Sequence, residues 1–207
     1  MLRLDHAVYA VRDLDVAAVR FREEFGLNSA VGGRHEGWGT ANRIVPLGEQ
    51  YLELIGIVDR VVAERTPFGR SIVEAATDGD RWVTLVAATD DIEAVAERLG
   101  LGVHAGSRVR PDGQVVRWRM TGLDDPVREP WMPFFITWDV PAELHPGRTP
   151  AGHSVRADGI ASVEVGGEAE RLRSWLGGQE LPIRVTDGVP GVHRVAVTTA
   201  GAEIVIA

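Results

Sequence analysis

The sequence predicts an α+β fold made of repeated β-α-β-β-β units whose curved, mixed or antiparallel sheets pack together. The first observation is a pattern of strand, acidic turn, helix and glycine that occurs three times in 207 residues. The second is that three strand-like pieces follow each of these helices. The third is that each unit has an apolar sheet face that it cannot bury alone, so neighbouring units should pack together with their helices outside.

The first unit runs from residue 4 to Ile57. The stretch "LDHAVYAVRDLDVAAVRFREEFGL" (4–27) has the pattern of an apolar strand and an amphipathic helix, with Asp13 or Asp15 as the N-cap. The pieces "NSAVGGRH", "GTANRIVPL" and "QYLELIGI" then supply three strands. The unit is therefore β-α-β-β-β.

The same plan recurs at 81–139 and 157–207. In the second unit the turn "RPDG" predicts a hairpin, because Pro presets φ and Gly accepts positive φ. We therefore expect residues 1–139 to hold two paired units, joined by a helical crossover at 60–78, and residues 157–207 to hold a third. The odd number of units leads us to expect that one sheet finds its partner in a homodimer.

Composition excludes several classes of function. The formal net charge of −8 argues against a nucleic-acid partner, because phosphate binding needs a basic face. The absence of cysteine removes thiolate metal sites and cysteine nucleophiles, so any metal must be held by His, Asp or Glu. The start of the chain lacks a basic region followed by an apolar one, and no apolar run is long enough for a membrane span. We expect a cytoplasmic protein without a membrane partner.

The motifs of the first unit resemble a known superfamily. The opening "LDHAVYAV", the repeat and "YLELIG" look like the vicinal oxygen chelate superfamily, which includes the glyoxalases. More narrowly, "GGRHEGWGTANRIVPLGEQYLELI" and "PFFITWD…HPG" resemble the bacterial glyoxalase-like domain proteins. The resemblance covers nearly the whole chain and implies a fold like that of glyoxalase and dihydroxybiphenyl dioxygenase. It does not fix the reaction, because the superfamily hosts isomerases, epimerases, ring-cleaving dioxygenases, thiol transferases and metal-free drug-binding proteins.

The resemblance also implies where a metal would bind. The superfamily places one ligand on the first strand and another on the last strand of each of two paired units, and the matching residues of unit one are His6 and Glu53. This pair would suit one divalent metal (Zn, Mn, Fe or Ni), and without a metal Glu53 would act as the catalytic base. The alternative is a His–Glu hydrogen bond inside the sheet that has no role in catalysis.

The other two units depart from this ligand pattern. In unit two the equivalent of His6 is Trp82 or Val83, and the closing strand around Phe135 carries no carboxylate before Asp139. In unit three Gly159 stands at the histidine position. At least half of the superfamily's ligand set is therefore missing.

The stretch at 32–44 has no counterpart in the other units, which makes it a candidate site lip. His35 would serve as a catalytic residue or third metal ligand, or it would be a turn histidine. Trp38, Thr40 and Asn42 alternate onto one face of a strand that begins near Trp38, and this face would line a binding pocket or face outward. Arg34 would reach an anionic substrate, or it would be solvated.

Four alternating arginines mark the hairpin of unit two: Arg108, Arg110, Arg117 and Arg119. They form an anion-binding face or a solvated edge that resists sheet aggregation, and we expect the edge. His145 and His153 lie in the linker without an acidic neighbour in sequence, so we expect them in loops.

The function that these residues favour is that of a glyoxalase-like protein that acts on or binds a small oxygenated organic molecule in a sheet-lined cavity. Its chemistry would be metal-assisted, of the lyase, isomerase or dioxygenase type. The alternative is a metal-free protein that sequesters a small molecule.

Overall fold

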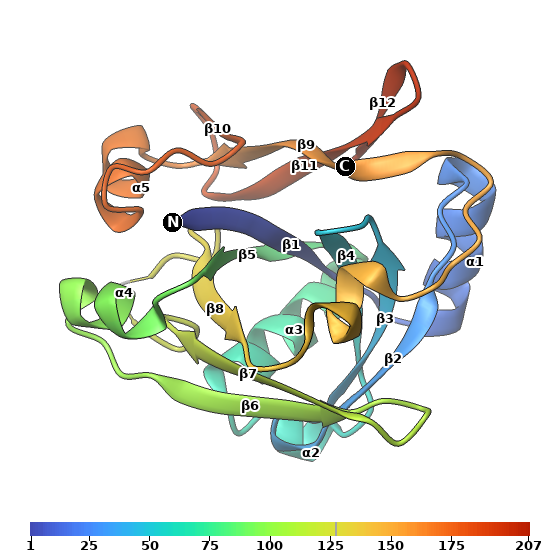
Figure 1. Ribbon diagram of the computed structural model, residues 1–207, viewed down its shortest axis with the longest axis horizontal. Coiled ribbons are helices and arrows are strands. Elements are labelled where there is room, and N and C mark those ends of the chain that lie inside the picture. The colour runs from blue at the N-terminus through green and yellow to red at the C-terminus, as the bar shows by residue number, and fades with distance from the viewer. Residues whose placement is uncertain (127) are drawn as a thin grey trace.

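The computed structural model describes residues 1–126 and 128–207, which form a closed barrel of eight strands with a separate four-stranded sheet against its side (Figure 1). The barrel strands are β1 (Leu2–Ala10), β2 (Ala30–His35), β3 (Thr40–Pro46), β4 (Tyr51–Ile57), β5 (Arg81–Thr89), β6 (His104–Val109), β7 (Val115–Thr121) and β8 (Phe134–Trp138). The second sheet comprises β9 (Ala157–Gly166), β10 (Ile183–Thr186), β11 (Gly191–Thr199) and β12 (Ala202–Ile206). The helices are α1 (Leu14–Phe25), α2 (Arg60–Ala63), α3 (Pro67–Asp78), α4 (Ile92–Leu99) and α5 (Ala169–Trp175).

Units one and two each contribute half of the barrel. Unit one supplies the strand order β1-β4-β3-β2 and unit two the order β5-β8-β7-β6. Asp13 caps α1 and Asp91 caps α4, each by accepting backbone N–H groups of the first turn. The long antiparallel pairing of β1 with β5 joins the two halves on one side. On the other side β2 meets β6 through a single paired position, Arg34 opposite Val109.

Unit three has the predicted order of elements but different strand pairing. In units one and two the first strand pairs with the last, whereas β9 pairs with β10 and β11 and the order is β10-β9-β11-β12. It is therefore not a third copy of the same fold. Its apolar face packs on the outside of the barrel, where Trp82 Nε1 donates to the carbonyl oxygen of Ile206 at 3.0 Å. Since this face is covered within one chain, sheet packing does not require the expected homodimer, which stays a prediction.

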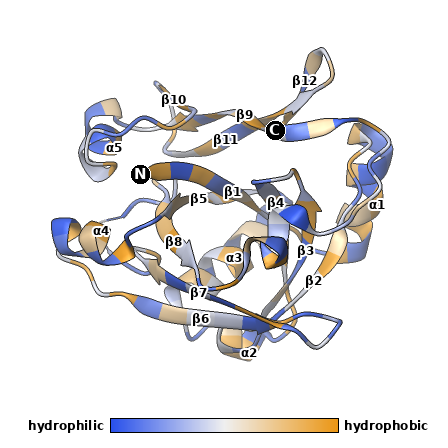
Figure 2. Cartoon of the chain, in the orientation of Figure 1, coloured by the Kyte–Doolittle hydropathy of each residue, from blue (hydrophilic) through white to orange (hydrophobic). Residues whose placement is uncertain are grey.

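Two apolar cores stabilise this arrangement. The outer core lies between the barrel wall and unit three and includes Leu4, Leu85, Val163 and Val195. The inner core lies inside the barrel, where Phe68 and Ile72 of α3 pack among inward residues of both units. Figure 2 shows hydrophobic residues interleaved with hydrophilic ones along β1 and the outer sheet, as expected for strands that bury one face. The inner core leaves one polar region, described below.

The linker between units two and three returns to unit one. It contains two short 3₁₀ turns, Ala142–Leu144 and Pro146–Arg148. The backbone N–H of Gly48 donates to the carbonyl oxygen of Gly147 at 3.0 Å, and His153 bonds both the N–H of Asn28 and the carbonyl oxygen of Pro46. No helix in the described residues is long and apolar enough to cross a membrane.

Candidate functional site

A small cavity lies inside the barrel with polar groups on one side and aromatic rings on the other. Its volume is about 30 Å³, enough for a metal ion or one or two waters but far below the ~300 Å³ of a small-molecule pocket. As the side chains stand, an organic molecule does not fit. Its polar lining is His6, His35, Asn42, Tyr51, Glu53 and Arg108, and its apolar lining is Trp38, Phe68, Trp118, Phe134, Ile136 and Trp138.

A β-bulge brings Asp5 and His6 together in β1. Leu4 pairs with Ala87 and His6 with Val86, so Asp5 is an extra residue in the ladder. The bulge breaks the alternation that would otherwise send neighbouring side chains to opposite faces. Asp5 Oδ1 and His6 Nδ1 are 2.5 Å apart. Leu4 therefore packs in the outer core while His6 lines the cavity, although regular alternation would place the two on one face.

Asp5 is a buried carboxylate with three donors. Besides His6, Trp138 Nε1 donates to Oδ2 at 3.0 Å and His145 Nε2 contacts the same oxygen at 3.1 Å. Burial by itself raises the pKa of Asp5, but the hydrogen bonds from His145 and His6 outweigh it and hold the pKa well below its usual value. His145 is thus not a free loop histidine: it crosses from the linker to complete this cluster.

The second nitrogen of His6 faces Glu53. Because Nδ1–H donates to Asp5, Nε2 carries the lone pair and accepts from the Tyr51 hydroxyl at 3.2 Å. Glu53 Oε2 lies 3.7 Å from the same nitrogen, while Asn42 Nδ2 donates to Glu53 Oε1 at 2.5 Å. Burial, followed by the charges of Asp5 and Glu53, raises the pKa of Tyr51 well above its usual value, so this hydroxyl keeps its proton. One oxygen of Glu53 is therefore fixed and the other faces an imidazole.

His35 approaches Glu53 from another strand. Its Nδ1 bonds Thr40 Oγ1 at 3.1 Å and its Nε2 lies 4.0 Å from Glu53 Oε1. Burial lowers the pKa of His35 to about 4, against a smaller opposing effect of Glu53, so the imidazole is neutral near pH 7.

Arg108 adds a buried positive charge from unit two. The residue is 6% exposed, and its Nη1 donates to the carbonyl oxygen of Gly32. Burial lowers the pKa of Arg108, opposed by the charges of Tyr51 and Glu53. The expectation of a solvated arginine edge is therefore wrong: Arg108 is buried, and although Arg117 is exposed, β6 and β7 lie within a closed barrel and form no edge.

The donors fit a divalent metal in type but not in spacing. His6 Nε2, His35 Nε2 and Glu53 are two imidazoles and one carboxylate, and Asp5 and Thr40 orient the imidazoles as in many metal sites. Two ligands at ~2.1 Å from one ion lie roughly 3.0–3.4 Å apart, shorter than the 3.7 and 4.0 Å found here. Within residues 1–126 and 128–207, no group of three such side chains has metal-binding geometry.

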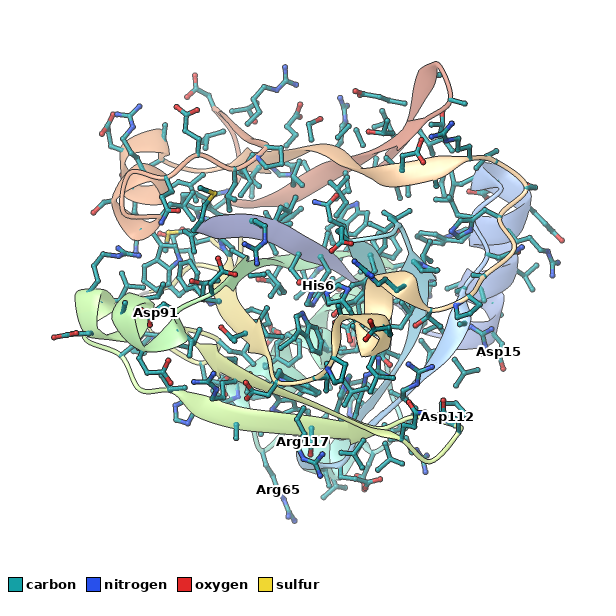
Figure 3. All side chains as sticks on the ribbon, in the orientation of Figure 1. His6, Asp15, Arg65, Asp91, Asp112 and Arg117 are labelled. Carbon is teal, nitrogen blue, oxygen red and sulfur yellow. The ribbon has the colours of Figure 1, made fainter. Side chains whose placement is uncertain are left out.

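The structure brings most of the predicted site residues together. His6, Glu53, His35, Trp38 and Asn42 line the cavity, and Thr40 is buried beneath His35. The third strand begins at Thr40 and not near Trp38, which ends a 3₁₀ turn and reaches the cavity from there. Arg34 lies outside the cavity, exposed on the outer side of β2. In Figure 3, His6 lies inside the barrel, whereas Asp15 and Asp91 lie outside it near the starts of α1 and α4.

Other members of the site were missed because their signals are not local. Asp5 adjoins His6 in sequence, but strand alternation argues that the two should face opposite ways. His145, Trp138 and Arg108 come from distant segments, and no spacing pattern links them to His6.

Except for Thr84, unit two places no polar side chain where unit one places those of its site. Matching the capping residues Asp13 and Asp91 makes Thr84 the equivalent of His6, which corrects the predicted Trp82 or Val83. The strand registers then make Phe134 the equivalent of Glu53. Phe134 lies in the predicted closing strand around Phe135 and is not a carboxylate. By the same registers, Met120, Trp118 and Gly106 stand at the positions of Asn42, Thr40 and His35.

Comparison with protein families agrees with this architecture. The family model described as a glyoxalase-like domain matches residues 4–181. The chain belongs to the glyoxalase-like domain family. The match confirms the resemblance to the glyoxalase-like proteins of the vicinal oxygen chelate superfamily. A search of curated proteins finds no match to the sequence.

Solved structures support the fold. A Staphylococcus aureus protein described as hypothetical is 19% identical with a TM-score of 0.79, over 98% of this chain and 93% of that one. Methylmalonyl-CoA epimerase of Streptomyces coelicolor is 19% identical with a TM-score of 0.47, over 67% of this glyoxalase-like chain and 98% of the epimerase. The Mycobacterium tuberculosis epimerase is also 19% identical, with a TM-score of 0.45 and coverage of 66% and 86%. At these TM-scores the epimerases support no inference about chemistry.

Proposed function

We propose that this glyoxalase-like protein catalyses proton transfer on a small oxygenated organic molecule, in an isomerase- or lyase-type reaction, with Glu53 as the base. The observation that carries the proposal is the geometry of Glu53: Asn42 fixes one carboxylate oxygen, and the other lies 3.7 Å from His6 Nε2. A carboxylate held inside an apolar barrel, with its free oxygen directed at an acid–base group, suits general base catalysis.

The proposed step needs no reactant other than the substrate and the side chains of the site. Glu53 takes a proton from a carbon next to a carbonyl group, and the C–H electron pair moves into the resulting enolate. The Arg108 guanidinium, which lines the cavity, stabilises the negative oxygen. Return of the proton to the same or a neighbouring carbon completes an isomerisation. His35, neutral near pH 7, is the second group placed to carry a proton.

The Asp5–His6 pair supports this step by fixing an imidazole tautomer. With Nδ1–H committed to Asp5, His6 offers only Nε2 to the cavity. His6 is therefore proposed as a proton acceptor and Asp5 as its positioning residue. Three donors hold Asp5 itself in place.

Solvent-deuterium exchange tests the proposal without a known substrate. Wild-type protein is incubated in D₂O with a panel of 2-oxo and 2-hydroxy acids and aldehydes, and loss of C–H signal is followed by proton NMR. We expect exchange with at least one member of the panel, and Glu53→Gln should lower the rate by about 100-fold or more. Failure of the wild type to exchange any compound faster than buffer would contradict the proposal.

A metal-assisted form of this chemistry is the second candidate, favoured by the orientation of both Nε2 atoms toward Glu53. His6, His35 and Glu53 would hold one divalent ion (Zn, Mn, Fe or Ni), which would supply Lewis-acid polarisation of a substrate oxygen. Metal analysis of protein purified without added metal tests it. Stoichiometric metal lost in both His6→Ala and Glu53→Gln would support it, and a metal-free but exchange-active wild type would reject it.

The rival function is metal-free sequestration of a small molecule. It needs no proton transfer. Binding of a panel compound with unchanged C–H signal, and equal affinity of wild type and Glu53→Gln, would favour this rival over catalysis.

A further inference from the structure

A groove on the outer wall of the barrel lies directly behind the site, where units one and two meet. It has a volume of about 530 Å³, within the usual range of small-molecule pockets. Its lining comes from β2, from β6 and from the turns that follow each: Val31, Gly33, Arg34, Glu36, Gly37, Ser107, Arg108, Val109, Arg110 and Pro111. It follows the seam that only one paired position, Arg34 opposite Val109, holds closed.

The groove is positively charged in a protein that is negative overall. Arg34, Arg108 and Arg110 line it against one carboxylate, Glu36, whereas the whole chain has a net charge of −8. Arg110 also pairs with Asp112 at 3.4 Å, but Arg34 is exposed and has no ion-pair partner in the described part of the chain. Such a local reversal of sign attracts anions.

Arg108 links the groove to the cavity, because among the described residues it is the one that the two linings share. The residue is only 6% exposed, yet it has no ion-pair partner among residues 1–126 and 128–207. Its Nη1 is satisfied by the carbonyl oxygen of Gly32, one of five donors that a guanidinium offers. The charge of Glu53 acts on this guanidinium without an ion-pair contact, so the remaining N–H donors of Arg108 are available to an anion.

We propose that this groove binds an oxyanion, a carboxylate or phosphate group, at one end of the molecule whose reactive end reaches the cavity past Arg108. The groove supplies the volume that the cavity of about 30 Å³ lacks. The identity of the reacting end rests on the proposed function, whereas anion binding by the three arginines does not.

Calorimetric titration at low salt with two probes, succinate and inorganic phosphate, tests the proposal. We expect one-to-one binding of at least one probe, and the tighter of the two identifies the source of the oxyanion. Arg108→Gln should weaken that binding at least 10-fold and Arg34→Gln about 3-fold. The matched control is Arg117→Gln, on the exposed face of the same hairpin (Figure 3), which should bind as tightly as the wild type.

Two further variants keep the test decisive. If Arg108→Gln lowers the melting temperature, the double variant Arg34→Gln/Arg110→Gln reports on the groove without altering the buried guanidinium. Glu53→Gln removes a negative charge that acts on Arg108 and should bind the probe at least as tightly as the wild type, so loss of deuterium exchange and loss of anion binding are separate results. Absence of binding by both probes, or equal weakening by Arg117→Gln and Arg108→Gln, would overturn the proposal.

Discussion

The two halves of the barrel have the same backbone plan and opposite interiors. Unit one directs His6, Glu53 and Asn42 into the cavity, while unit two directs Phe134 and Met120 from the equivalent positions. Unit one thus carries the acid–base groups, and unit two supplies most of the apolar wall together with one charged residue, Arg108. A low-dielectric wall strengthens every charge interaction across the cavity.

The histidine positions show the same division. The histidine of unit one is held by a buried carboxylate, whereas its equivalent, Thr84, accepts from Arg128 Nη1 at 2.9 Å. Arg128 also donates to the carbonyl oxygens of Leu123 and Met132, so its charge is spread over backbone acceptors. Burial lowers the pKa of Arg128 to about 10. The second unit therefore has a cationic structural clamp where the first has an acid–base pair.

The largest difference between the halves should appear in stability. Asp5→Ala removes the acceptor of three buried donors and should lower the free energy of unfolding by about 3–5 kcal/mol. Thr84→Val removes one acceptor of a guanidinium that keeps several others, and should cost about 1 kcal/mol. Urea denaturation measures both. Equal losses of unfolding free energy in the two variants would show that the Asp5 cluster contributes no more to stability than the single hydrogen bond to Thr84.

The next effect is a pH dependence of the stability, which arises from His35 in unit one. Burial holds the pKa of His35 at about 4 in the folded protein, below the ~6.5 of the unfolded chain. The unfolded chain therefore takes up the proton first as pH falls. Stability from this group is complete above pH 6.5 and should decline by about 3 kcal/mol as pH falls toward 4.

Denaturation at several pH values tests this dependence. His35→Gln should flatten the decline between pH 6.5 and 4, while His104→Gln, an exposed histidine of unit two, should leave it unchanged. If the free energy of unfolding of His35→Gln falls with pH as steeply as that of the wild type, the buried imidazole does not stay neutral.

A smaller effect should follow from the close approach of Gly32 to Asn42. A Cβ at position 32 would lie 2.0 Å from Asn42 Oδ1, so Gly32→Ala must push Asn42 away from Glu53. We expect a loss of about 1–3 kcal/mol, measured by thermal unfolding. Gly37→Ala is the control, because its Cβ meets nothing within 4 Å. Similar losses of stability in both variants would show that the contact between position 32 and Asn42 is not the cause.

Much of the fold follows from local patterns in the sequence. The acidic turn before the helix, the glycine after it and the alternation of apolar residues predicted the elements of all three units. The pairing of unit three could not be predicted, because the order of strands within a sheet depends on packing against the barrel and not on local sequence. His6 and Glu53 lie close together, as the resemblance implied, because both side chains point into the barrel from the paired strands β1 and β4.

The rest of the site depends on departures from regular geometry. The bulge at Asp5 adds one residue to β1 and changes the direction of its side chain, which alternation alone does not reveal. The same uncertainty of register moved the predicted equivalent of His6 by one or two residues from Thr84. His145 and Arg108 reach the site through contacts with residues that are 140 and 76 positions away in the sequence, and only the folded chain brings these together.

The central claim, that unit one supplies the base and unit two most of the apolar wall, is tested most directly by comparing Glu53→Gln with Phe134→Leu at equivalent positions. The measurement is the rate of solvent-deuterium exchange into the compound that the wild type exchanges fastest. The account predicts a loss of about 100-fold or more for Glu53→Gln and less than about 10-fold for Phe134→Leu. Equal losses in the two variants, or full activity of Glu53→Gln, would contradict it.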